Sequence, residues 1–68
     1  MGRSENKASR LLKIEALLLA FPQGMSQAEV ARRLNVNRST INRDLADLPK
    51  HIYLEDDGRL HIDREAYL

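Results

Sequence analysis

Two short amphipathic stretches separated by one sharp turn occupy residues 26–45. Ser26 is suited to cap a helix, and Glu29 three residues later completes a capping box. Asn35 stands where the chain must turn, because asparagine tolerates the left-handed conformation better than most non-glycine residues. Between the cap and the turn, apolar side chains recur at helical spacing. The pattern predicts a helix over residues 27–34.

A second helix is expected over residues 38–48. Asn37 is placed to cap its first turn, and Pro49 ends it because proline disfavours helical geometry in the residue before it. Its buried stripe consists of three apolar residues spaced by four and then three positions, namely Ile41, Leu45 and Leu48. The opposite face carries short or polar side chains, which suit a DNA major groove. Two helices joined in this way form the helix–turn–helix of DNA-binding proteins.

This second helix resembles the recognition helix of DeoR-type and WYL-type (helix–turn–helix type 11) bacterial transcription regulators. That family typically shows the string Thr-Ile-Arg-Arg-Asp-Leu. The closest stretch of this chain is Ser39-Thr40-Ile41-Asn42-Arg43-Asp44-Leu45, in which the string begins at Thr40. The resemblance spans the range 10–62, with Asn42 where arginine is common and Asn35 where glycine is common. It implies a three-helix winged helix–turn–helix that binds DNA, followed in the full protein by an effector-sensing or oligomerising domain.

Length and composition favour one small domain over residues 1–68, which buries roughly 60% of its unfolded surface. The absence of cysteine excludes disulfides and thiolate metal sites. No secretory signal is present, and the longest apolar run, residues 16–21, is too short to cross a membrane. The expected setting is therefore the cytoplasm, and the resemblance implies a prokaryotic cell.

The formal net charge of +1 conceals an asymmetry along the chain. Residues 1–51 contain nine Lys and Arg against five Asp and Glu, a balance of +4. Residues 52–68 contain two against five, a balance of −3. Because nucleic-acid binding depends on cationic contacts to phosphate, the first part is suited to face DNA and the last part is not.

A first helix is predicted over residues 10–21, after a polar and frayed segment over residues 1–9. Its core face consists of five apolar residues at helical spacing, namely Leu11, Ile14, Leu17, Leu18 and Phe21. A second apolar face carries Leu12, Ala16 and Leu19. Two interpretations of that face stay open: the wing or a C-terminal segment covers it, or it is a homodimer contact.

Residues 52–62 predict a β-hairpin, the wing of the fold. A three-residue loop, Asp56-Asp57-Gly58, sorts apolar and polar side chains onto separate faces, with Gly58 in the left-handed position. The resulting pairs are Glu55 with Arg59, Leu54 with Leu60, Tyr53 with His61 and Ile52 with Ile62. The acidic tip is expected to point away from DNA, and Asp63 to cap a truncated next element over residues 63–68.

Seven residues are candidates for DNA contact: Ser26, Gln27, Arg38, Ser39, Thr40, Asn42 and Arg43. Arginine pairs with guanine O6 and N7, asparagine with adenine N6 and N7, and serine or threonine with bases or phosphates. Arg43 is expected to contact a base because it projects from the centre of the outward face. Arg38, in the first turn, is expected to hold a phosphate. Ser26 and Gln27 lie at a helix N-terminus, where exposed N–H groups favour anions.

The charged residues behind this face have other predicted roles. Asp44 lies at the edge of the buried stripe and is expected to pair with Arg32, Arg33 or a backbone group. Arg32 and Arg33 either approach the DNA backbone or only solvate their helix.

No catalytic arrangement, cofactor site or metal site is predicted. His51 and His61 are not at a spacing typical of metal ligands, and the chain has no glycine-rich phosphate loop or nucleophile elbow. The sequence therefore predicts sequence-specific binding of double-stranded DNA by the N-terminal domain of a transcription regulator. The acidic wing favours an alternative from another class, a winged-helix protein-interaction module with little DNA affinity.

Overall fold

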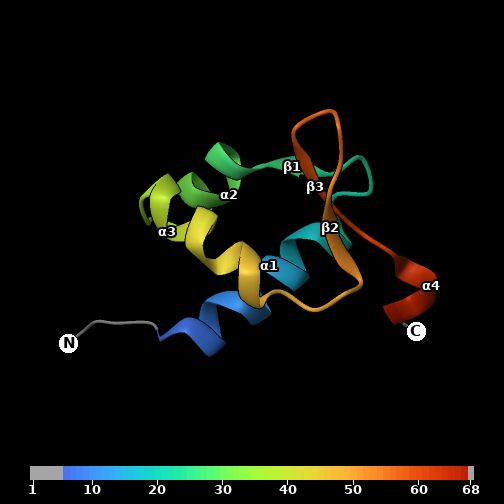
Figure 1. The fold of residues 1–68 in the computed structure, drawn as a ribbon, viewed down its shortest axis with the longest axis horizontal. Helices are drawn as coiled ribbons and strands as arrows, with labels where there is room; N and C mark the ends of the chain where they lie inside the picture. Colours follow the sequence, from blue (N-terminus) through green and yellow to red (C-terminus); the bar gives the residue numbers. More distant parts are fainter. Residues whose placement is uncertain (1–5, 68) are drawn as a thin grey trace.

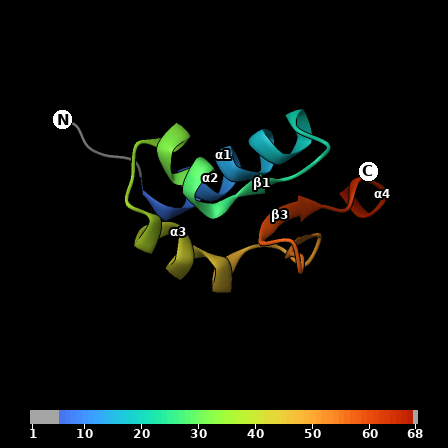
Figure 2. The same ribbon diagram turned by 90° about the horizontal axis from the view of Figure 1, so that it is seen from above.

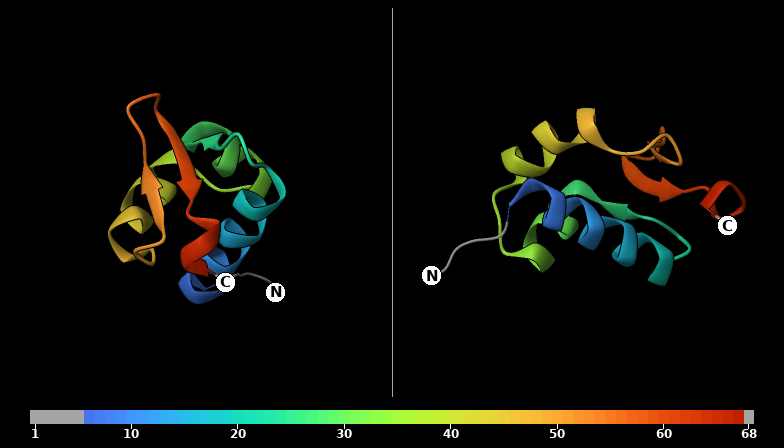
Figure 3. Two further views of the ribbon diagram at one scale, coloured as in Figure 1. Left: turned by 90° about the vertical axis from the view of Figure 1, so that its right-hand side faces the viewer. Right: turned by 90° about the horizontal axis from the view of Figure 1, so that it is seen from below.

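The computed structural model describes residues 6–67, which form a winged helix–turn–helix (Figure 1). The elements follow in the order α1 (Lys7–Ala20), β1 (Met25–Ser26), α2 (Gln27–Leu34), α3 (Arg38–Asp44), the 3₁₀ turn η1 (Leu45–Asp47), β2 (Ile52–Leu54), β3 (Arg59–Ile62) and α4 (Arg64–Tyr67). α1 and α2 lie on one side of the molecule, and α3 with η1 lies on the other (Figures 2 and 3). The predicted class, a mainly helical winged helix–turn–helix with a small β-hairpin, is confirmed.

α1 begins three residues before the predicted start at residue 10, because Asn6 caps it. The Asn6 side chain accepts a hydrogen bond from the Ser9 backbone N–H at 2.9 Å. Residues 7–9 therefore form the first turn of a helix rather than a frayed segment, while the rest of that predicted segment, residues 1–5, lies outside the described residues. The helix ends at Phe21, whose N–H donates to carbonyls of the last turn.

The core lies between the helices and the sheet. Its buried side chains come from nearly every element and are Ile14, Leu18, Met25, Val30, Ala31, Ile41, Ile52 and Leu60. Ile14, Val30 and Ile41 are fully buried, so α1, α2 and α3 each contribute at least one anchor. Burial of an aliphatic side chain of this size contributes about 1.5–3 kcal/mol, and these contacts fix how α3 lies on α1 and α2.

The wing has the predicted register. Ile52 pairs with Ile62, Tyr53 with His61 and Leu54 with Leu60. Gly58 has a φ of 81°, in the left-handed region that the three-residue loop requires. The prediction of the hairpin pairing is therefore confirmed.

The sheet nevertheless has one more strand than the predicted two-stranded wing. β1 pairs antiparallel with β3, joining Met25 to Leu60 and Ser26 to Arg59, so the strand order is β1-β3-β2. A two-residue strand shows no alternation of apolar and polar residues, which is why the sequence pattern could not reveal it.

The second motif helix is shorter than the predicted range 38–48. α3 ends at Asp44, the chain tightens into η1, and Leu48 is extended (φ −72°, ψ 149°) before Pro49. Leu48 is extended before Pro49, as expected, but the turn that precedes it, η1, is already 3₁₀ rather than α-helical. Asn37 occupies the cap position without a side-chain cap hydrogen bond, which corrects its predicted capping role.

The second apolar face of α1 is not covered by the wing. Leu12 is 66% exposed and Ala16 is exposed, whereas Leu19 is half-buried. Arg64 of α4 donates hydrogen bonds to the carbonyls of Leu18 and Leu19, so the last described helix lies against the end of α1. A homodimer contact at Leu12, Ala16 and Leu19 stays a prediction.

Candidate nucleic-acid interface

The turn between α2 and α3 sets the geometry of the candidate interface. Asn35 adopts the left-handed conformation (φ 59°, ψ 46°), as the sequence predicts. The Val36 N–H then donates to the Ala31 carbonyl at 3.0 Å, which closes the turn. Ile41 is buried against this corner, so the opposite face of α3 is turned outward.

The outward face of α3 carries most of the predicted contact residues. Arg38, Ser39, Asn42 and Arg43 are exposed, and Thr40 is half-buried. Three of these residues line one shallow hollow together with Gln27, a half-buried residue at the start of α2. The lining residues are Gln27, Arg38, Ser39 and Asn42. The fold therefore gathers these four around one depression, while Thr40 and Arg43 lie outside its lining.

Arg38 and Arg43 are available to bind an anion. Within residues 6–67, neither guanidinium makes a hydrogen bond or an ion pair. Exposed arginines of this kind supply N–H groups that donate hydrogen bonds to phosphate oxygens and to guanine edges.

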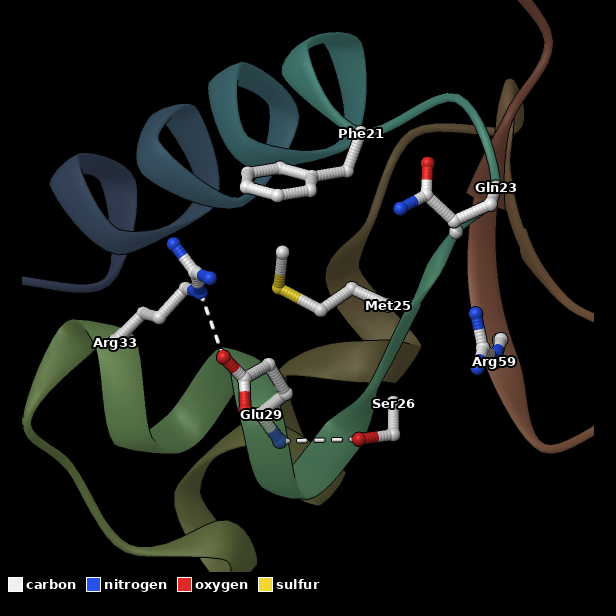
Figure 4. Close-up of a pocket in the computed structure, with 8 residues that line it drawn as sticks. Phe21, Gln23, Met25, Ser26, Glu29, Arg33 and Arg59 are labelled. Carbon is white, nitrogen blue, oxygen red and sulfur yellow. Dashed lines mark hydrogen bonds and ion pairs between the residues drawn. The ribbon is translucent and has the colours of Figure 1, made fainter.

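Arg32 and Arg33 are engaged within their own helix. Both donate to the Glu29 carboxylate, with Arg33 Nε at 2.7 Å from Oε2. Hydrogen bonds from Arg32 first, and from Arg33 second, hold the pKa of Glu29 below its ordinary value. The Arg33 guanidinium also lies over the Phe21 ring, 4.6 Å from its centroid (Figure 4). Of the two predicted roles, these contacts favour support of α2 over contact with DNA.

Ser26 uses its side chain as the predicted cap. Its Oγ accepts a hydrogen bond from the Glu29 N–H at 3.1 Å (Figure 4). It lines a separate hollow with Phe21, Met25 and Arg59 rather than the one on α3. Ser26 therefore lines a different hollow from the other candidates, whereas Gln27, the next residue, lines the hollow on α3.

Asp44 has a partner that the sequence prediction missed. Arg10 of α1 donates to both carboxylate oxygens, with Nε 2.7 Å from Oδ2 and Nη2 3.0 Å from Oδ1. The Asp44 side chain is only 2% exposed, and that of Arg10 is 16% exposed. The predicted pairing with Arg32 or Arg33 is wrong, because those side chains bind Glu29 instead. This bidentate ion pair links the last residue of α3 to α1 on the buried side of α3.

The wing tip is acidic and partly tied down. Asp57 accepts the Arg59 backbone N–H at 2.8 Å, and that bond, with a smaller effect of nearby His61, holds the pKa of Asp57 below its ordinary value. Glu55 and Arg59 meet through a backbone hydrogen bond of 3.0 Å. Among the described residues, however, no ion pair joins their side chains, which corrects the pairing predicted for Arg59.

The remaining histidine makes a structural contact. His51 Nε2 lies 2.7 Å from a carboxylate oxygen of Glu15, linking the segment before β2 to α1. In the part of the chain that the structure describes, no group of three or more His, Asp or Glu side chains is placed to hold a metal ion. No helix in that part is long and apolar enough to cross a membrane.

The helices α1, α2 and α3, a tight left-handed turn and a three-stranded sheet with a projecting hairpin define the winged helix–turn–helix class. A family model described as an HTH domain matches residues 10–55, which is most of the chain. The chain belongs to this family of helix–turn–helix domains, and the resemblance inferred from the sequence is confirmed. Comparison with curated proteins and with solved structures finds no match. DNA binding is the function that membership of this family indicates.

Proposed function

We propose that this domain binds double-stranded DNA in a sequence-specific manner, as the DNA-binding domain of a transcription regulator. The observation that carries the proposal is the exposed face of α3, where Arg38 and Arg43 make no ion pair within residues 6–67. The second helix of a helix–turn–helix lies in the major groove, where its exposed side chains meet base edges and phosphates.

Each candidate residue has a distinct role in this proposal. Arg43 contacts a base, and Asn42 has the chemistry to recognise adenine. Arg38 contacts a phosphate at the entrance of the groove. Ser39 and Thr40 contribute hydroxyl contacts, and a phosphate approaches the N-terminus of α2 at Ser26 and Gln27.

The competing function is a protein-interaction module without appreciable DNA affinity. Electrophoretic mobility shifts on random duplexes at several salt concentrations distinguish the two. We expect non-specific binding with a dissociation constant of about 10⁻⁴–10⁻⁶ M that weakens steeply as salt rises. Absence of any salt-dependent shift at the low-salt end would refute the proposal.

Arg38→Ala is expected to weaken binding to all sequences alike. Because one phosphate contact is lost, the magnitude of the slope of log K against log salt should fall by about 0.9. Fluorescence anisotropy over a salt series measures this slope. Lys50→Ala is the matched control, since it removes one exposed positive charge from the segment before β2. An equal change of slope in both variants would remove Arg38 from the interface.

Neutralising the wing tip is expected to change DNA affinity little. Glu55→Gln together with Asp56→Asn removes two exposed carboxylates and retains Asp57, which supports the loop through the Arg59 N–H. If the tip faces away from DNA, only a weak long-range repulsion is relieved, and affinity should rise by less than about threefold at low salt. A tenfold gain or more would place the wing near phosphate and contradict the proposed orientation.

A further inference from the structure

β2 is an open edge of the sheet. In the order β1-β3-β2 it pairs only with β3, and no described strand lies beyond it. Glu55 N–H donates to the Arg59 carbonyl at 3.0 Å, so Glu55 belongs to a hydrogen-bonded pair. In an antiparallel ladder such pairs alternate, which turns the N–H and C=O of the preceding residue, Leu54, away from β3. The edge thus presents the backbone donor and acceptor of Leu54 and, by the same alternation, the carbonyl of Ile52, whose own N–H donates to the Pro49 carbonyl.

Apolar side chains are exposed at the same edge. Leu54 is 49% exposed and Tyr53 is 41% exposed, and Leu12 on α1 is the other large hydrophobic residue that is exposed among the described residues. The Tyr53 ring is stacked on His61, with centroids 5.9 Å apart, so it is held in place on the sheet. Tyr53 and Leu54 project from opposite faces of β2. A strand added at this edge would therefore meet an ordered aromatic ring on one face and an exposed leucine on the other, which offers contact area at little cost in conformational entropy.

The negative charge next to Tyr53 and Leu54 determines which kind of partner strand can bind. Glu55 and Asp56 follow Leu54 directly and are exposed, and within residues 6–67 their carboxylates make no ion pair. A second copy of this chain, paired antiparallel through Leu54, would bring the two Glu55 residues to within roughly 7 Å along the strands. Like charges at that spacing repel, whereas lysine or arginine on an added strand would be attracted.

We propose that the wing edge, defined as Tyr53, Leu54, Glu55 and Asp56, binds an extended basic segment of another protein by strand addition. The main chain of the segment pairs with Leu54. An apolar side chain of the segment covers Leu54 on one face of the sheet, and the stems of its cationic side chains cover Tyr53 on the other face, which also carries Glu55. Its cationic side chains meet Glu55 and Asp56. This interaction is separate from the α3 face and does not depend on DNA binding.

A capped synthetic peptide of alternating lysine and valine is the probe. Titration into ¹⁵N-labelled protein should shift the Leu54 amide resonance and slow its hydrogen exchange. Glu55→Gln with Asp56→Asn should weaken binding about fivefold, as loss of two surface charge contacts predicts. The matched control, Asp47→Asn with Glu65→Gln, removes two exposed carboxylates outside the wing and should leave affinity within about twofold.

Three results would overturn the proposal. The first is equal weakening in both double variants, which would mean attraction to net charge alone. The second is undiminished binding of a peptide N-methylated at its pairing residue, because such a peptide cannot complete the ladder with Leu54. The third is a dimer of the free domain in sedimentation with slow exchange at Leu54, which would assign the edge to a second copy. The amide spectrum of each variant establishes that it is folded.

Discussion

Arg10→Met should lower the free energy of unfolding by about 3–5 kcal/mol, because it leaves a buried carboxylate without its partner. Asp44 is 2% exposed and receives two hydrogen bonds from Arg10, so water cannot replace the lost guanidinium without opening the core. A domain of this length has only marginal stability, and the variant should be largely unfolded. Urea denaturation, with sucrose added to bring the variant into range, measures the difference.

Lys7→Met is the matched control on the same helix. Lys7 Nζ lies 2.6 Å from Asp47 Oδ2, but both side chains are about half exposed, at 52% and 49%. A solvent-exposed pair is worth about 0–1 kcal/mol, so this variant should remain folded. Arg10→Met combined with Asp44→Leu should recover most of the loss, because it removes the unpaired charge. An Arg10→Met variant as stable as Lys7→Met would contradict the anchoring role.

The second large effect is expected on DNA affinity. Arg43→Ala should cost about 1–3 kcal/mol on the preferred duplex and abolish preference at one base pair. The side chain is exposed on α3 and makes no ion pair within residues 6–67, so its loss should leave the fold intact. Competition binding against duplexes that differ at single positions measures both changes.

Arg43→Lys separates charge from geometry. Lysine keeps the positive charge but lacks the planar fork that binds O6 and N7 of one guanine together. We therefore expect Arg43→Lys to retain non-specific binding while most of the preference is lost. If Arg43→Ala binds the preferred duplex as tightly as the parent and with the same preference, Arg43 does not contact a base.

What the sequence could predict was local. Asn35 in the left-handed turn and Gly58 in the hairpin loop each follow from a preference of one residue type for one conformation. The hairpin pairing follows because a slip by one residue would mix the two faces. The Ser26 cap is likewise set within four residues. Such features need no knowledge of the rest of the chain.

What the sequence could not predict depends on distant residues. Arg10 and Asp44 are 34 positions apart, and several other cations were equally plausible partners until α1 was placed against α3. β1 exists only because β3 lies beside Met25 and Ser26. For the candidate site, the outward face of α3 followed from helical periodicity. Only the packed structure reveals that Gln27 lies at that face and that Arg32 and Arg33 bind Glu29.

Because of its position, the Arg10–Asp44 pair makes the stability of the fold independent of the side chains on the exposed face of α3. It holds α3 from the buried side, whereas Arg38, Ser39, Asn42 and Arg43 are exposed on the other side. Exposed helical positions of this kind tolerate substitution within about 0.5 kcal/mol of stability. Substitutions at those four positions can therefore change what the exposed face of α3 binds, without compensating mutations in the core.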